Sequence, residues 1–78
     1  MAEKVQQSHA GDFRMRLPKG QILWETIRDE KGRVKWAITS DPARTTYYLY
    51  SVSGETTVAV AKKVGNPKGF EKYTGVRL

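Results

Sequence analysis

The stretch TTYYLYSVSGETTVAVAKKV, from Thr45 to Val64, decides the fold of this chain. Two runs rich in β-branched and aromatic residues flank Ser53-Gly54, a pattern typical of two antiparallel strands joined by a tight turn. A two-residue loop at Ser53-Gly54 predicts four cross-strand pairs: Leu49 with Val58, Tyr47 with Val60, Tyr48 with Ala59, and Tyr50 with Thr57. Tyrosine rings would then lie on both faces of one strand. A half-buried sheet needs apolar residues on only one face, so the second set of rings requires a second layer, a partner or a ligand.

A second hairpin is predicted upstream, with residues 21–29 and 33–39 as strands and Asp29-Glu30-Lys31-Gly32 as the turn. With a three-residue loop at 30–32, one face would carry Ile22, Trp24, Val34, Trp36 and Ile38, and the other Leu23, Ile27, Lys35 and Ala37. A loop of two or four residues would exchange these partners, because a one-residue slip turns every side chain to the opposite face. In either register we expect both tryptophans to pack in the core.

The remaining segments complete a small β fold. Alternating apolar and basic residues predict a short strand over residues 13–17, and Phe70, Tyr73 and Val76 predict a final strand over residues 70–78. Short connections predict an all-β, antiparallel meander of five or six strands. Rings on both faces favour curling into a half-open or closed barrel over an open sheet that a second copy covers. Residues 1–12 lack periodicity, which predicts a disordered leader before a single small domain at 13–78.

Size and composition exclude several classes of protein. A chain of 78 residues has room for one domain with a small core, and the absence of cysteine excludes disulfides and thiolate chemistry. The only histidine, His9, lies in the predicted leader, so we expect no metal site and no cofactor. No apolar run approaches the ~20 residues of a membrane span, and residues 1–12 lack the apolar core of a signal peptide. We therefore expect a soluble cytoplasmic protein without membrane insertion.

The charge of the chain is basic and unevenly distributed. Lys and Arg number 14 against 8 Asp and Glu, a net charge of +6. Residues 1–12 carry −1, residues 13–44 carry +4, residues 45–60 carry −1 and residues 61–78 carry +4. The basic segments therefore flank the tyrosine hairpin. This distribution is compatible with nucleic acid, an anionic membrane surface or an acidic protein partner, and equally with a role in solubility.

The tyrosines at positions 48 and 50 are the principal binding candidates, because their predicted neighbours are small enough to leave the rings accessible. Exposed rings stack on nucleic-acid bases, and nearby cations pair with phosphates. In the same register Arg44 lies across from Lys63 and would flank the rings. The complete predicted nucleic-acid site consists of Tyr48, Tyr50, Arg44, Lys63, Arg33, Lys35, Lys62 and Lys68.

Two basic groups also have plainer interpretations. The first surrounds the tip of the upstream hairpin, where Asp29 and Glu30 partly neutralise it, and consists of Arg28, Lys31, Arg33 and Lys35. A solvated, ion-paired tip is the favoured interpretation there. The second surrounds the loop at residues 65–69 and consists of Lys62, Lys63, Lys68 and Lys72. That loop lacks the spacing of a phosphate-binding loop, so it is interpreted as a simple turn.

The carboxylates are scattered, and the predicted domain lacks both cysteine and histidine, so we expect no enzyme. The sequence predicts a non-enzymatic, basic β binding module that binds nucleic acid, with single strands favoured. The alternative is an interaction module that binds an acidic protein partner or forms a homodimer through the same tyrosine face.

Overall fold

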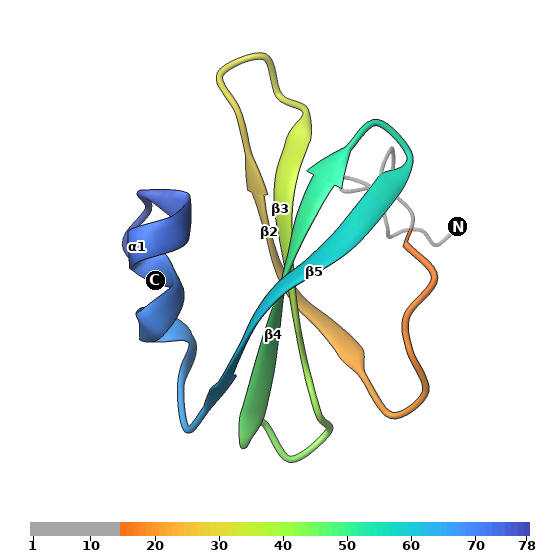
Figure 1. Cartoon of the computed structure of the whole chain (residues 1–78), viewed down its shortest axis with the longest axis vertical. Coiled ribbons are helices and arrows are strands. Elements are labelled where there is room, and N and C mark those ends of the chain that lie inside the picture. Colours follow the sequence, from red (N-terminus) through yellow and green to blue (C-terminus); the bar gives the residue numbers. More distant parts are fainter. Residues whose placement is uncertain (1–14) are drawn as a thin grey trace, which may run out of the picture.

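The computed structural model of the protein describes residues 15–78. These residues form one antiparallel sheet in the order β2-β3-β4-β5, followed by two short helices (Figure 1). The strands are β2 (Ile22–Arg28), β3 (Val34–Ser40), β4 (Thr46–Ser53) and β5 (Thr56–Val64). The predicted antiparallel meander is confirmed, but the described residues are mostly β and not all β, because two short helices follow the strands. Residues 15–78 do not form a barrel or supply five or six strands, because the sheet is open and its outer strands β2 and β5 do not pair.

The turn between β4 and β5 lies one residue later than the sequence pattern predicts. Ser53 pairs with Thr56, so Gly54 and Glu55 form the turn. Gly54 has a φ of 62°, a backbone conformation that glycine adopts without steric cost. All four predicted cross-strand pairs are wrong, because this shift is combined with a β-bulge farther along the hairpin.

The β-bulge moves the lysines of β5 to new partners. Tyr50 pairs with Ala59 and Leu49 pairs with Ala61, which leaves Val60 as the extra residue. Beyond the bulge, Tyr48 lies opposite Lys62 and Tyr47 lies opposite Lys63. The two lysines are adjacent in the sequence and therefore project from opposite faces of the sheet.

The β2–β3 hairpin has its turn where the sequence predicts it, but its faces differ from the prediction. The Asp29 side chain accepts two backbone N–H groups of the turn, at 2.9 and 3.0 Å. Two register irregularities in β2 bring Ile27 opposite Trp36, in the same cluster as Trp24. Val34 packs against the opposite face of the sheet. The predicted sorting of these faces is wrong because β2 does not alternate regularly, whereas the prediction that both tryptophans pack against the core is confirmed.

The C-terminal segment is helical, so the prediction of a strand over residues 70–78 is wrong. It forms η1 (Pro67–Phe70) and α1 (Glu71–Thr74). The Asn66 side chain accepts the Lys68 N–H at 2.9 Å, and Pro67 occupies the first turn, where its missing N–H has no cost. Gly75 ends α1 in the left-handed conformation, with its N–H on the Glu71 carbonyl at 2.8 Å.

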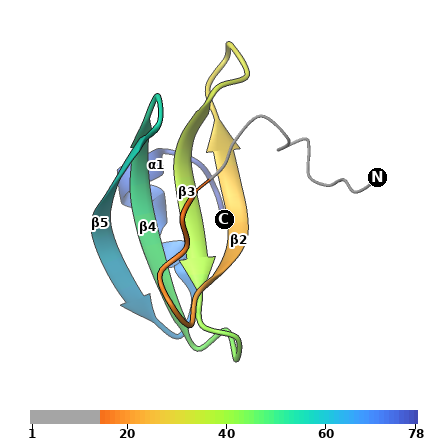
Figure 2. The same cartoon turned by 90° about the vertical axis from the view of Figure 1, so that its right-hand side faces the viewer.

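Each face of the sheet has its own buried cluster and its own cover (Figure 2). The cluster on the helix side consists of Ile38, Tyr47, Leu49 and Phe70. The cluster on the opposite side consists of Ala37, Tyr50 and Val52, and Met15 packs against it. In Figure 2 the N-terminal segment, in orange, crosses one face while η1 and α1 lie behind the other. The second layer that the tyrosine pattern requires is therefore supplied by the chain itself.

Gln21, which precedes β2, is hydrogen-bonded to two side chains of the central strands. Its Oε1 accepts hydrogen bonds from Thr39 Oγ1 at 2.5 Å and from the Tyr50 hydroxyl at 2.8 Å. Met15 to Leu17 have no strand conformation, so that part of the strand predicted at 13–17 is wrong. Residues 13 and 14 and the predicted leader at 1–12 lie outside the described residues.

Candidate functional site

The tyrosines of β4 differ sharply in accessibility. Tyr50 is only 8% exposed, and its hydroxyl donates to Gln21, so the prediction of an accessible ring at this position is wrong. Tyr47 is 7% exposed and meets Trp24 edge to face, with ring centroids 5.4 Å apart. Tyr48 is half-buried and is the one ring of the three that keeps a substantial surface.

Tyr48 has a lysine beside its ring. The Lys62 Nζ lies 6.0 Å from the ring centroid, at the outer limit of a cation–π contact. The contact exists because the bulge places these two residues opposite each other. A ring with an adjacent ammonium group provides one stacking surface and one phosphate partner in the same place.

Arg44 does not lie across from Lys63 as predicted. It lies in the turn between β3 and β4, with a φ of 60°, whereas Lys63 pairs with Tyr47. Asp41 holds this turn, because its carboxylate accepts the Thr45 hydroxyl at 2.5 Å and the backbone N–H groups of Thr45 and Thr46. These hydrogen bonds, that of the Thr45 hydroxyl first, lower the pKa of Asp41 below its ordinary value.

The other predicted cations are dispersed. Arg33 follows the β2–β3 turn and Lys35 lies within β3, whereas Lys68 lies in η1 at the other end of the chain. The structure brings Lys62 beside Tyr48 and places Lys63 on the other face of the same strand. The eight predicted site residues therefore do not form one surface, although the lysines of β5 do belong to a common site.

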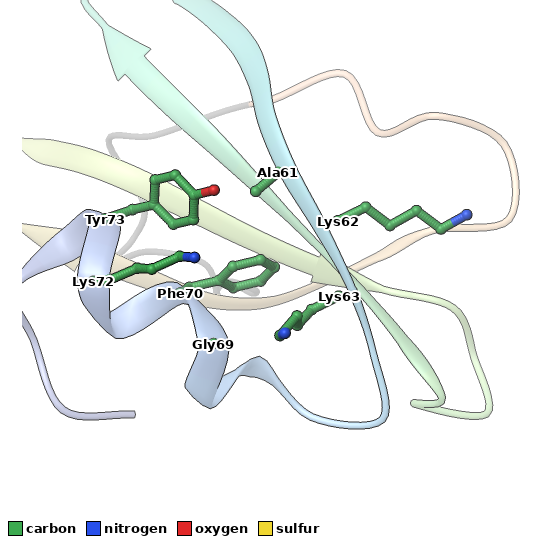
Figure 3. A pocket seen from close by; sticks show the side chains of 7 residues that line it. All are labelled: Ala61, Lys62, Lys63, Gly69, Phe70, Lys72 and Tyr73. Carbon is green, nitrogen blue, oxygen red and sulfur yellow. The ribbon is translucent and has the colours of Figure 1, made fainter.

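That common site is a pocket between β5 and the C-terminal helices (Figure 3). It has a volume of about 230 Å³. Its lining consists of Ala61, Lys62, Lys63, Gly69, Phe70, Lys72 and Tyr73. Figure 3 shows the Phe70 ring between the side chains of Lys63 and Tyr73, with Lys62 pointing away from them. Phe70 is 1% exposed and anchors the helices to the sheet, while the Tyr73 ring is 44% exposed.

The lining of the pocket is basic. Three lysines and no carboxylate line it among the described residues. Glu71 is the nearest acid in the sequence, but its Oε2 accepts the Leu78 N–H at 2.6 Å. The Lys72 Nζ lies 5.4 Å from the centroid of the Tyr73 ring. This arrangement suits an anion that carries an adjoining flat group, since the lysines attract the charge and the ring offers a stacking face.

Gly69 makes room for one of these lysines. A β carbon at this position would lie 2.9 Å from Lys63 Cδ and closer still to Cε. The aliphatic stem of Lys63 therefore passes over η1 at Gly69, where no side chain obstructs it. The geometry of η1 thus sets the position of a lysine in β5.

The sequence pattern does not point to Tyr73 and Phe70 as binding residues, because it predicts a strand over this segment. Asn66 and Pro67 are a helix-start signal and Gly75 is a helix-stop signal. Those signals mark the helical segment that contains α1, which places Tyr73 beside β5. The sequence pattern groups Lys62, Lys63, Lys68 and Lys72, and in the structure all of these except Lys68 line one pocket.

Other kinds of site find no support among residues 15–78. This part of the chain holds no group of three or more His, Cys, Asp or Glu side chains arranged to bind a metal ion. It also contains no helix that is long and apolar enough to cross a membrane. Comparisons of the chain with protein-family models, with curated proteins and with solved structures find no match.

Proposed function

We propose that the protein is a non-enzymatic binding module that takes single-stranded nucleic acid along β5. The observation that carries this proposal is the pocket lined by Lys62, Lys63 and Lys72, in which no described carboxylate competes for the cations. Tyr73 supplies an exposed ring at the same place. Lysines that follow a backbone, together with rings that accept bases of any sequence, are the usual means of binding single strands.

The binding surface continues around the strand. Lys62 lines the pocket and also lies beside Tyr48 on the other face of the sheet. The β5 strip, defined as Tyr48, Lys62, Lys63, Lys72 and Tyr73, therefore combines two partly exposed rings with three cations. A flexible single strand can bend around a sheet edge of this kind, whereas a stiff duplex meets only part of it.

The energetic contribution of each part can be estimated. Stacking of one base on an aromatic side chain contributes ~1–3 kcal/mol, and each phosphate that a lysine neutralises releases counterions. Two stacked bases and three phosphate contacts suit moderate affinity that falls steeply with added salt. The net charge of +6 adds a long-range attraction that speeds association.

A homodimer is the second candidate function, and a different observation favours it. Val58 and Val64 of β5 are 57% and 75% exposed, and β5 lies at one end of the described sheet. A second copy that pairs along β5 would cover these valines. Against this pairing stand the bulge at Val60 and the lysines at 62 and 63, since bulges and lysines are the features that usually protect an outer strand.

Fluorescence anisotropy with labelled single-stranded and duplex oligonucleotides of one sequence, at low and at physiological salt, tests the proposed function. We expect tighter binding of the single strand and weaker binding of the Y73A variant at both salt concentrations. Sedimentation of the free protein, run in parallel, tests the homodimer. Equal binding of single strand and duplex that disappears at physiological salt would reduce the interaction to charge attraction and refute the proposal.

A further inference from the structure

The interior of the pocket differs from its rim. Figure 3 shows the side chains of Lys63, Lys72 and Tyr73 around the Phe70 ring, whereas Lys62 extends away from them. Lys63 and Lys72 therefore both line the pocket around Phe70, and among the described residues no carboxylate lines it. Two cations on the lining of one pocket repel each other, and a bound anion offsets that repulsion.

The size of the pocket limits what it can hold. Its volume of about 230 Å³ is below the ~300–1,000 Å³ of pockets that enclose a drug-sized ligand. A complete nucleotide would therefore not be enclosed. A phosphate with part of its sugar fits, while the attached base remains outside, where the exposed ring of Tyr73 offers a stacking surface.

The charge of the interior points to a particular phosphate. A phosphate monoester carries about −1.5 to −2 at pH 7, whereas a diester within a strand carries about −1. Two ammonium groups match the charge of the monoester. A monoester also presents three terminal oxygens, and Lys63 and Lys72 reach the pocket from different elements, β5 and α1, so that they can bind different oxygens.

We propose, on the basis of the proposed function, that this pocket receives the terminal phosphate monoester of a nucleic-acid strand. Lys63 and Lys72 pair with its oxygens, and Tyr73 stacks on the terminal base. Gly69 keeps the site open, because any side chain there would displace the stem of Lys63. The rest of the strand continues past Lys62 towards Tyr48.

Three oligonucleotides of one sequence test this proposal, one with a 5′-phosphate, one with a 3′-phosphate and one with neither. We expect one phosphorylated end to bind at least about tenfold more tightly than the unmodified strand. The K72Q variant should abolish that preference. The K68Q variant is the matched control, because it removes the same charge from η1 at a residue that does not line the pocket.

A second measurement places the site without any oligonucleotide. Inorganic phosphate, titrated into isotope-labelled protein, is expected to shift the backbone amide resonances of Lys63, Gly69 and Lys72 before all others. The K72Q variant should lose these shifts while its remaining spectrum stays that of the folded protein. Small shifts spread over every lysine would overturn the proposed site.

The outcomes separate this inference from the proposed function. Equal binding of the three oligonucleotides, with K72Q weakening all of them alike, would overturn the terminal-phosphate site and leave single-strand binding intact. Failure of all three to bind would overturn both proposals. A preference for one end that survives in K72Q would place the phosphate elsewhere and overturn the assignment to this pocket.

Discussion

The stem of Lys63 crosses η1 at Gly69, where a β carbon would lie 2.9 Å from Lys63 Cδ. A residue of the last strand and a residue of the first C-terminal helix are therefore fitted to each other. Since Lys63 also pairs with Tyr47 in the sheet, the contact links the position of an ammonium group to the packing of the core.

The G69A substitution should displace Lys63 without unfolding the protein. The atoms that must move belong to the flexible end of a lysine side chain, and Gly69 is not among the glycines with positive φ, so alanine meets no backbone strain. We expect the free energy of unfolding to change by less than ~1 kcal/mol. Oligonucleotide affinity should fall clearly in the same variant. Unchanged affinity, measured by anisotropy on folded G69A, would show that Lys63 does not contribute from this position.

Tyr73 and Tyr50 should respond in opposite ways to substitution. Y73A removes an exposed ring and should weaken single-strand binding by ~1–3 kcal/mol with little effect on stability. Y50F removes a buried hydroxyl that donates to Gln21, and should lower the free energy of unfolding by ~0.5–1.5 kcal/mol while binding stays unchanged. Denaturant titration and anisotropy on both variants check the pair. Loss of binding in folded Y50F would place the binding contact at Tyr50 and not at Tyr73.

Stability should decrease in acid through Asp41. Hydrogen bonds in the turn lower the pKa of this carboxyl in the folded protein, so the ionised form stabilises the fold at pH values above its unfolded pKa, about 3.9. That contribution is lost as the pH falls through the lower folded pKa. The D41N variant has no carboxylate at this position, so the contribution of its charge to stability is absent at every pH.

Chemical unfolding of wild type and D41N between neutral pH and strong acid measures this contribution. The difference in the free energy of unfolding should be constant near neutral pH and shrink once the pH falls below about 4. D41A, which also loses the acceptors for the N–H groups of Thr45 and Thr46, should be less stable than D41N throughout. A difference between wild type and D41N that does not change with pH would show that the charge has no role in the turn.

Phe70 should be the most sensitive residue of the C-terminal segment. It is 1% exposed and packs against Ile38 and Leu49, so replacement by alanine removes a large buried ring and leaves a cavity. We expect F70A to lose ~3–5 kcal/mol of stability, a large part of the total in so small a domain. F70L should lose much less. If F70A unfolds like wild type in a thermal melt, the helices do not share the core of the sheet.

The sequence indicated the strands well because their residue types repeat. The β-branched and aromatic runs around Ser53 and the Asp-Glu-Lys-Gly turn at 29–32 are local signals, and the structure places strands and turns close to them. The register between β4 and β5 could not be predicted from the sequence. The bulge at Val60 has no local signature, since it depends on how β4 and β5 twist and pack as a pair.

The sequence predicts the basic character of the candidate site but not which residues line it. The sequence pattern groups the lysines at 62, 63, 68 and 72, of which all but Lys68 line the pocket, but it does not tell which face of the sheet each side chain occupies. In β5, the bulge determines which face Lys62 and Lys63 occupy. The position of Tyr73 at the pocket was not predictable, because its segment is too short to show helical periodicity. Only Asn66 and Gly75 mark the ends of this segment.

The salt dependence of single-strand binding, compared between wild type and the K63Q/K72Q double variant, tests the central claim most directly. Each phosphate contact contributes about 0.7 to the slope of log affinity against log salt. We therefore expect the slope of the double variant to be smaller by about 1.4. The K68Q variant, which removes one charge outside the pocket, should change the slope by less than the ~0.7 of one phosphate contact. A double variant that is folded and retains the wild-type affinity and slope would show that the pocket beside β5 does not bind the strand.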